Sequence, residues 1–201
     1  MDSLQIGPTS LAIPLFKHGY VNDPSNYTIM INTLFAKLFG SMLDNRISKW
    51  EEERGKRAKG QVGFRPKHST MDHGITLRHI IEKVWEKKGE AFCCFVDFKK
   101  AFDTVPKDKL WHRMEELGVP IHLRAAVHRL YEEVKVKIRT SDGISESFRS
   151  DIGVKQGWPF SPTLFGLYID KLEEWLNLED GDGVVVDEFV IRLLLYADDL
   201  I

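Results

Sequence analysis

Two short, nearly continuous apolar segments that run into aspartate constrain the fold of this chain more than any other feature of its sequence. The first, Ala91–Phe98 (AFCCFVDF), carries its one charge at Asp97, and the second, Phe189–Tyr196, leads directly to Asp198 and Asp199. Apolar runs of this length are typical of strands buried on both faces. Segments with helical spacing of apolar residues lie between the two, so the interleaved pattern predicts a mixed α+β or α/β domain.

Apolar spacing, together with proline and glycine, divides the remaining sequence into helices, strands and loops. A period near that of the α-helix predicts helices over residues 29–50, 69–89, 106–118, 120–133 and 161–176. Alternation predicts a half-buried strand with a wholly basic outer face, followed by a hairpin turn and a partner strand over 144–148. That basic face consists of Lys135, Lys137 and Arg139. Residues 1–23 show little periodicity, which predicts an irregular leader.

The composition is that of a globular protein. The 201 residues are 43% hydrophobic and 29% charged, enough for one domain or for one domain with a smaller lobe. No apolar run approaches the roughly 20 residues of a membrane-spanning helix. The N-terminus does not resemble a signal peptide, and the adjacent Cys93 and Cys94 cannot by themselves build a disulfide framework or a metal site. We therefore expect a soluble protein of the nucleus or cytoplasm.

The net charge of −2 conceals a basic segment between residues 54 and 68. This segment contains no acid and six basic residues, which are Arg54, Lys56, Arg57, Lys59, Arg65 and Lys67. The acidic run Glu51-Glu52-Glu53 directly precedes this segment and offsets its positive charge in the net charge of the chain. A local positive field would attract an anionic partner, whereas the alternative is a solvated loop.

Asp97, Asp198 and Asp199 raise the possibility of a metal site. A buried carboxylate costs several kcal/mol unless its charge is compensated, and three carboxylates together repel one another unless a cation lies between them. Mg²⁺ prefers oxygen ligands and keeps open positions for phosphate, which makes it the natural candidate. The alternative is that Asp198 and Asp199 form a solvated turn and that Asp97 caps a strand end.

Four motifs stand in the order and at the spacing of a known family. They are residues 61–72 (QVGFRPKHSTMD), 95–105 (FVDFKKAFDTV), 153–162 (GVKQGWPFSP) and 196–199 (YADD). The last three resemble motifs A, B and C of reverse transcriptases, and the first resembles a motif of their fingers. The detail is closest to the enzymes of non-LTR (LINE-like) retrotransposons and group II introns.

This resemblance implies an RNA-directed DNA polymerase that uses an RNA template, a DNA primer and dNTP. Asp97, Asp198 and Asp199 would be the palm carboxylates, with Asp97 and Asp198 as the principal ligands of two Mg²⁺ ions, or of Mn²⁺. The backbone carbonyl of Phe98 would complete a metal shell. Phe102 would face the sugar of the incoming nucleotide and exclude a 2′-hydroxyl.

The resemblance also implies contacts with nucleotide and nucleic acid. Gln156 and Gly157 would lie against the nucleotide, and Arg65 would neutralise its charge. Tyr196 would lie against the primer end. The remaining nucleic-acid contacts would come from the two basic segments, namely Lys56, Arg57, Lys59, Lys135, Lys137 and Arg139.

The family suggests a division into the fingers and palm of a right-hand polymerase. The expected parts are a leader (1–23), fingers (24–90), palm with motif A (91–118), an insertion with the basic hairpin (119–150) and palm with motifs B and C (151–201). Because the sequence stops two residues after Asp199, we expect an incomplete palm without the second strand of its last hairpin, and no thumb. The missing palm and thumb segments would be supplied by a longer element protein.

Two further departures from the family pattern leave a second interpretation open. Thr28 stands where the family usually has an arginine, and Trp158 and Phe160 are larger than usual in motif B. The alternative to an active polymerase is therefore a catalytically inactive, nucleic-acid-binding remnant. An RNA-templated RNA polymerase is disfavoured by Phe102 and by the Ala-Asp-Asp of the last motif.

Overall fold

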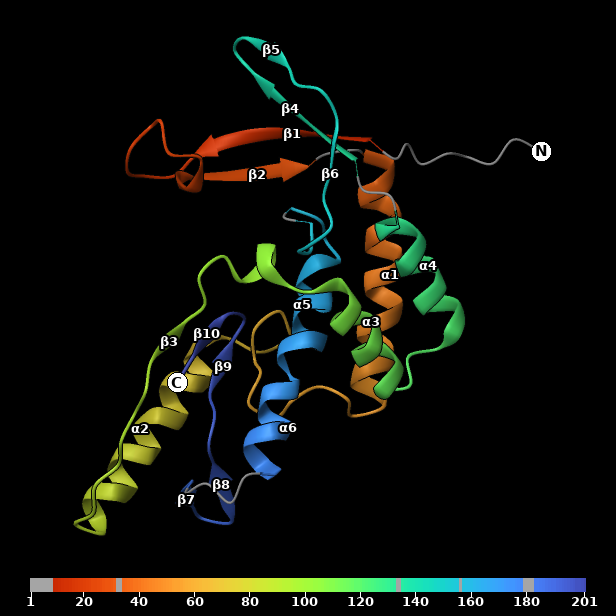
Figure 1. The fold of residues 1–201 in the computed structure, drawn as a ribbon. Helices are drawn as coiled ribbons and strands as arrows, with labels where there is room; N and C mark the ends of the chain where they lie inside the picture. The colour runs from red at the N-terminus through yellow and green to blue at the C-terminus, as the bar shows by residue number, and fades with distance from the viewer. Residues whose placement is uncertain (1–8, 32–33, 133–134, 156, 179–182) are drawn as a thin grey trace.

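The computed structural model describes residues 9–31, 34–132, 135–155, 157–178 and 183–201. Their backbone forms an upper sheet, a central group of helices and a lower sheet that lies beside a long helix (Figure 1). The helices carry most of the buried apolar side chains, and the lower sheet carries the aspartates singled out above.

The upper sheet combines strands from distant parts of the chain. Its strands are β1 (Thr9–Phe16), β2 (Tyr27–Ile31), β4 (Lys135–Thr140), β5 (Gly143–Ile144) and β6 (Phe148–Arg149). β1 lies between β2, which is antiparallel to it, and β4, which is parallel to it. A short 3₁₀ helix (Pro24–Asn26) precedes β2. The turn that joins β4 to β5 is Ser141-Asp142, one residue earlier than the predicted Asp142-Gly143, because Gly143 already pairs with Thr140 as the first residue of β5.

The expectation of an irregular leader over 1–23 is wrong for Thr9–Phe16, which is a strand, whereas residues 17–23 are irregular as expected. The misleading residue is Pro14, since proline cannot donate a hydrogen bond within a sheet. β4 pairs with β1 only as far as Ala12, so Pro14 has a neighbour on the β2 side alone. The missing N–H therefore costs the sheet no hydrogen bond to β4.

Five helices form the central layer. They are α1 (Leu34–Glu53), α3 (Lys107–Glu116), α4 (Ile121–Tyr131), α5 (Ser161–Ile169) and α6 (Lys171–Leu178). α5 is buried on nearly all sides and contacts α1, α3 and α6, which explains why its sequence (SPTLFGLYI) is apolar all round. The helix predicted over 161–176 is in fact two helices, which meet at the buried Asp170. Within the described ranges, no helix is long and apolar enough to cross a membrane.

Helix α2 (Thr70–Glu86) begins where the sequence predicts. Ser69 is its N-cap and Asp72 completes a capping box, in which each residue satisfies a backbone N–H at the start of the helix. The hairpin of β7 (Val184–Val186) and β8 (Phe189–Ile191) contacts the far end of this helix.

The lower sheet has three short strands in the order β3–β10–β9. They are β3 (Val96–Asp97), β9 (Leu195–Tyr196) and β10 (Asp199–Leu200). The expectation that the second strand of the Asp198-Asp199 hairpin is missing is wrong, because β10 follows the turn and pairs with both neighbours. The strand predicted over 189–196 is correspondingly divided into β8 and β9.

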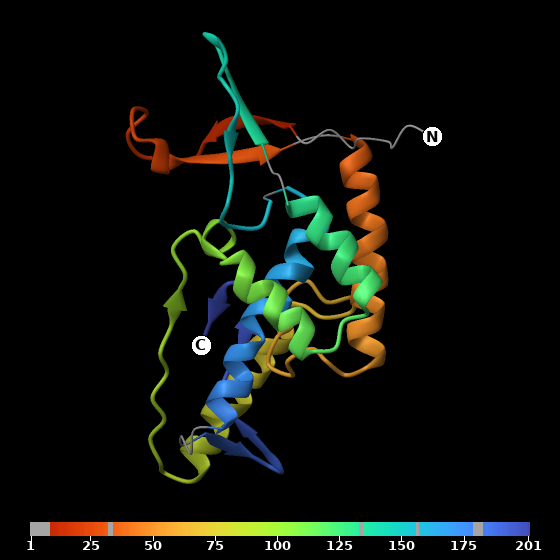
Figure 2. The same ribbon diagram turned by 45° about the vertical axis from the view of Figure 1, so that its right-hand side comes forward.

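The prediction of a doubly buried strand over Ala91–Phe98 is also wrong for most of its length. Only Val96 and Asp97 are in a strand, and Phe92 is 92% exposed and Phe95 72% exposed. Figure 2 shows this segment as an extended trace that runs along one side of the molecule into β3. The described residues leave Phe92 and Phe95 largely uncovered, so burial by these residues does not explain why the segment is apolar.

Candidate active site

The pairing of the lower sheet brings the aspartates of two distant motifs together. Asp199 lies directly opposite Asp97 on one side and opposite Tyr196 on the other. Residues directly opposite each other in antiparallel strands share a face of the sheet, so these three side chains share one face. That face is exposed, whereas Leu195 on the other face is fully buried. The structure thus brings motifs A and C together, as the family resemblance implies.

Asp198 lies in the tight turn between β9 and β10. The two central residues of this turn are Ala197 and Asp198, and Ala197 has a φ of +60°. A two-residue turn with this backbone favours glycine at the first position, and an alanine held there costs roughly 1–2 kcal/mol. Ala197 is buried and Asp198 is half-buried, so the turn is packed against its surroundings.

The charges of Asp97 and Asp199 do not require a nearby cation, contrary to the expectation for buried carboxylates. Asp97 and Asp199 are exposed, so water solvates their charges without a metal. Among the residues that the structure describes, no three His, Cys, Asp or Glu side chains form a group that could hold a metal ion. The donors themselves are the carboxylate oxygens that Mg²⁺ prefers, and the strand pairing places them at neighbouring positions. The residues present thus suit this metal, although their side chains do not converge in this conformation.

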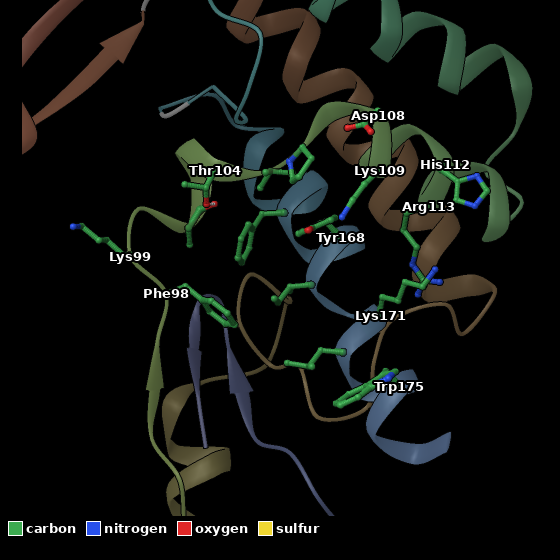
Figure 3. A pocket seen from close by; sticks show the side chains of 16 residues that line it. Phe98, Lys99, Thr104, Asp108, Lys109, His112, Arg113, Tyr168, Lys171 and Trp175 are labelled. Atoms are coloured by element: carbon green, nitrogen blue, oxygen red, sulfur yellow. Dashed lines mark hydrogen bonds between the residues drawn. The ribbon is translucent and has the colours of Figure 1, made fainter. Parts of the chain in front are cut away.

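A cavity of about 890 Å³ lies beside the end of β3. Figure 3 shows Phe98 facing Tyr168 on α5 and Trp175 on α6 across this cavity, with Lys109, His112 and Lys171 around it. The side chain of Phe98 therefore points into this cavity, toward the helices. Only its backbone remains available for the metal contact that the family resemblance implies.

Phe102 lies where three of the motifs meet. Its ring stacks on Phe165 of α5, with 4.7 Å between ring centroids, and contacts the edge of Phe64 from the upstream motif at 6.1 Å. Its carbonyl accepts a hydrogen bond of 2.8 Å from the N–H of Val154 in motif B. The ring is half-buried, so it packs on the core and still presents a surface.

The loop of motif B depends on glycine and on buried aromatic rings. Gly153 and Gly157 both have positive φ, and Gly153 lies so close to the backbone of Asp103 that a Cβ would collide with it. Trp158 is 3% exposed and Phe160 is fully buried, so these large residues fill the core instead of crowding the loop. Gln156, predicted to contact the nucleotide, lies outside the described residues.

Lys155 in the same loop is partly buried. Its ammonium lies 4.1 Å from the ring centroid of Trp158 and 5.3 Å from that of Tyr131, and it donates to the carbonyl of Leu130. Burial, with a smaller contribution from the positive charge of Lys107, lowers the pKa of Lys155 to about 8.

Arg57, predicted to contact nucleic acid, has its side chain buried and paired within the protein. Its side chain is 5% exposed and lies between two buried carboxylates, with 3.5 Å to Glu51 and 3.9 Å to Asp170. Its guanidinium also donates to the carbonyl of Gly63 at 3.4 Å and packs against Gly166 of α5, where no side chain would fit. Arg57 therefore fastens the basic segment to the core.

The other basic residues divide into paired and exposed ones. Arg65 makes two hydrogen bonds with the carboxylate of Glu52, at 2.8 and 2.9 Å. Lys56 and Lys59 are exposed, as predicted for a solvated or nucleic-acid-binding surface. On β4, Lys135 and Arg139 are exposed and Lys137 is half-buried. β4 belongs to the upper sheet, which Figure 1 places apart from the lower sheet of the aspartates.

Burial gives Glu51 an unusually high pKa, although its carboxyl lies beside the guanidinium of Arg57. Burial raises the pKa of Glu51 from 4.5 to about 8, against the opposing effect of Arg57 and with a further rise caused by Asp170. Burial also raises the pKa of Asp170. The cluster is therefore most stable with a single negative charge opposite Arg57, and Glu51 keeps its proton.

Replacing Glu51 with glutamine is expected to stabilise the protein increasingly as the pH rises from about 5 to 9. The unfolded carboxyl ionises near 4.5, whereas the folded one keeps its proton until about 8. The folded state binds more protons across this window, so the stability of the native protein falls as the pH rises through it. Glutamine does not titrate, so its advantage in melting temperature should widen with pH.

Glu52→Gln is the control for that measurement. The neighbouring Glu52 is more exposed, and its hydrogen bonds with Arg65 lower its pKa, so its contribution has the opposite sign and is lost on acidification. If the Glu51→Gln difference in melting temperature is the same at pH 5 and at pH 9, Glu51 does not hold a proton in the folded state.

A residue that the sequence analysis overlooked lies directly behind the Asp198 turn. Gln61 is fully buried, and its side-chain amide makes hydrogen bonds with both backbone groups of Ala197. Gln61 stands in the upstream motif, but the pattern of that motif drew attention to Arg65. Only the pairing of residues 60–62 with β9 reveals the contact.

Comparison with known proteins now identifies the class. Residues 17–201 match the family model described as reverse transcriptase (RNA-dependent DNA polymerase), so the chain belongs to the reverse transcriptase family. Its relatives include retrotransposon polymerases. It is 28% identical over 188 residues to a Pol polyprotein of the retrotransposable element R2 of Popillia japonica, and 29% identical over 198 residues to the RNA-directed DNA polymerase from mobile element jockey of Drosophila funebris. The predicted resemblance to non-LTR retrotransposon enzymes is confirmed.

These matches cover most of this chain but little of the relatives. They include 92% and 96% of this chain, and only 26% and 21% of the R2 and jockey proteins. Among solved structures, telomerase from Candida albicans, in complex with a fragment of telomeric RNA, aligns with the whole chain and with 38% of its own length, at a TM-score of 0.57 and 14% identity. This likeness confirms the α+β fold of a reverse transcriptase domain.

Proposed function

We propose that this chain carries the nucleotidyl-transfer site of an RNA-directed DNA polymerase. The observation that supports the proposal most directly is the pairing of Asp97 with Asp199, next to the Asp198 turn, in a member of the reverse transcriptase family. In this role the chain would extend a DNA primer on an RNA template with dNTP. The lower sheet and the helices behind it would form the palm (91–118 and 151–201), and residues 24–90 with the basic hairpin would contribute the fingers.

The aspartates would hold Mg²⁺ or Mn²⁺. Asp97 and Asp198 would be the principal ligands, with Asp199 and the backbone carbonyl of Phe98 as further donors. When bound, the metal would stabilise the negative charge that develops during phosphoryl transfer. The exposed face shared by Asp97, Tyr196 and Asp199 leaves room for a primer end and a triphosphate.

The surrounding residues would select and position the substrates. Gly157, and Gln156 beside it, would lie against the nucleotide. Arg65 would release the carboxylate of Glu52 and bind the phosphates of the nucleotide instead. The template would pass along basic residues that are exposed or half-buried, whose contacts with phosphate weaken as the salt concentration rises. These are Lys56, Lys59, Lys135, Lys137 and Arg139.

Incorporation of dTTP on an RNA template with a DNA primer tests this function. The assay is run with Mg²⁺, with Mn²⁺ and with EDTA, and RNA binding is measured on the same preparation. Metal-dependent incorporation is the expected result. If a folded chain binds RNA but incorporates nothing under any condition, the chain is a nucleic-acid-binding remnant and not a polymerase.

Replacing Phe102 with alanine is expected to let rNTP compete with dNTP. The ring would otherwise clash with the 2′-hydroxyl, and its loss should reduce the preference for dNTP by about 10- to 100-fold. Measuring the ratio of dTTP to UTP incorporation in one sample removes the effect of any unfolded fraction. Phe64→Ala, which removes the edge partner of Phe102, is the control, and equal ratios in the two variants and the wild type would exclude the gating role.

A further inference from the structure

The side chain of Gln61 makes hydrogen bonds with the N–H and the C=O of Ala197, which lies in the turn between β9 and β10. Its Oε1 accepts hydrogen bonds from the N–H of Ala197 at 3.0 Å and from the N–H of Gly63 at 2.8 Å. Its Nε2 donates to the carbonyl of Ala197 at 3.3 Å. The side chain is fully buried, so water does not compete for these bonds.

The backbone around Gln61 is fixed to the same strand. The N–H of Val62 donates to the carbonyl of Leu195 at 3.0 Å, and the N–H of Leu195 donates to the carbonyl of Gly60 at 2.9 Å. Gly63 lies so close to the backbone of Ala197 that no Cβ would fit between them. The segment 60–63 is thus an additional partner of β9, and Gln61 reaches from it to the turn.

Glutamine suits this position better than other side chains. A primary amide accepts at its oxygen and donates at its nitrogen, which is what the N–H and C=O of Ala197 require. Ala197 has positive φ, and an alanine keeps such a backbone only when its surroundings determine it. The contacts of Gln61 supply that constraint, and Asp198 and Asp199 follow directly in the chain.

We propose that Gln61 is a positioning residue for the metal-binding carboxylates. By holding both backbone groups of Ala197, it fixes the turn and thereby the approach of Asp198 and Asp199 to Asp97. Gln61 itself touches neither substrate nor metal. This inference rests on the proposed function, because it assigns Gln61 a role in the metal affinity of that same site.

Metal binding without nucleic acid gives the decisive measurement. The full chain is titrated with Mn²⁺, and the paramagnetic broadening of the backbone amide signals of Asp198 and Asp199 is followed by NMR. In Gln61→Leu, which removes all three hydrogen bonds, the Mn²⁺ concentration for half-maximal broadening should rise about tenfold. Gln61→Glu keeps the acceptor and loses the donor, so its rise should be smaller, and it serves as the test variant if Gln61→Leu does not fold.

Val62→Ala is the matched control. Val62 is a buried neighbour whose truncation destabilises the same segment but leaves the hydrogen bonds of Ala197 in place. Its melting temperature should fall, as in Gln61→Leu, but its Mn²⁺ titration should match that of the wild type. The Mg²⁺ concentration for half-maximal dTTP incorporation should follow the same order of variants.

The outcomes separate this inference from the proposed function. If the wild type binds Mn²⁺ more tightly than Asp198→Asn, but the folded Gln61 variants titrate like the wild type, the positioning role is overturned and the polymerase site stands. If the Gln61 variants and Val62→Ala weaken Mn²⁺ binding equally, Gln61 contributes only stability and the inference is again overturned. If the wild type and Asp198→Asn titrate alike and neither incorporates dTTP, the proposed function fails and this inference fails with it.

Discussion

Replacing Asp198 with asparagine is expected to reduce dTTP incorporation by at least about a thousandfold, because the variant loses a charged ligand of the proposed metal site. The fold should persist. Asp198 is half-buried in a surface turn, and asparagine is the same size and tolerates turn conformations well. The measurement is the initial rate of incorporation at saturating Mg²⁺, with the melting temperature of each protein measured in parallel.

Asp187→Asn is the matched control for this experiment. Asp187 lies in the turn between β7 and β8, its side chain is 75% exposed, and its nearest charged partner is Lys83 at 3.9 Å. Removing this charge alters the net charge by the same amount but should leave the rate unchanged. If Asp198→Asn retains the rate of the wild type, Asp198 is not a metal ligand of the reaction.

Replacing Arg57 with methionine should cause the largest loss of stability among replacements of the basic residues in this segment. Methionine fills the space of the arginine stem but leaves the buried negative charge of the Glu51–Asp170 cluster without its cation. Removing one partner of a buried ion pair costs about 3–5 kcal/mol. In a protein of this size that corresponds to a decrease in melting temperature of roughly 10 °C.

Lys56→Met separates this structural role from nucleic-acid binding. Lys56 is the exposed neighbour of Arg57, so its replacement should change the free energy of unfolding by no more than about 0.5 kcal/mol. It should instead weaken RNA binding and reduce the salt dependence of that binding. If Arg57→Met keeps its melting temperature and loses RNA affinity, Arg57 is a nucleic-acid contact after all.

The two strand ends that carry the aspartates could be predicted from local sequence, whereas their convergence was implied only by the resemblance of the motifs to reverse transcriptases. Motif A and motif C each carry their aspartates at the end of a short apolar segment, and a strand periodicity places such residues at a sheet end. The capping box at Ser69 and Asp72 is equally local, and so is the hairpin turn before Gly143, which the sequence places only one residue too late. In each case the residues that determine the structure lie within a few positions of one another.

The failures all involve information that is not local. An arginine in a basic segment does not show that its charge partner is Asp170, more than a hundred residues away. The apolar segment before Asp97 predicts burial, but whether anything covers Phe92 and Phe95 depends on the rest of the fold. Gln61 was overlooked for the same reason, because its partner is the backbone of Ala197.

The distance in sequence between Gln61 and Ala197 also determines when the site can form during folding. The two residues are 136 positions apart, and the parallel pairing of β1 with β4 spans a similar length of chain. Contacts between distant segments close long loops before they yield any stabilisation, and chains rich in them fold slowly. During synthesis Gln61 cannot make its hydrogen bonds with Ala197 until the turn between β9 and β10 has left the ribosome. The carboxylate site therefore forms only after these distant segments have met, and refolded protein should recover its native helix content before it recovers metal binding.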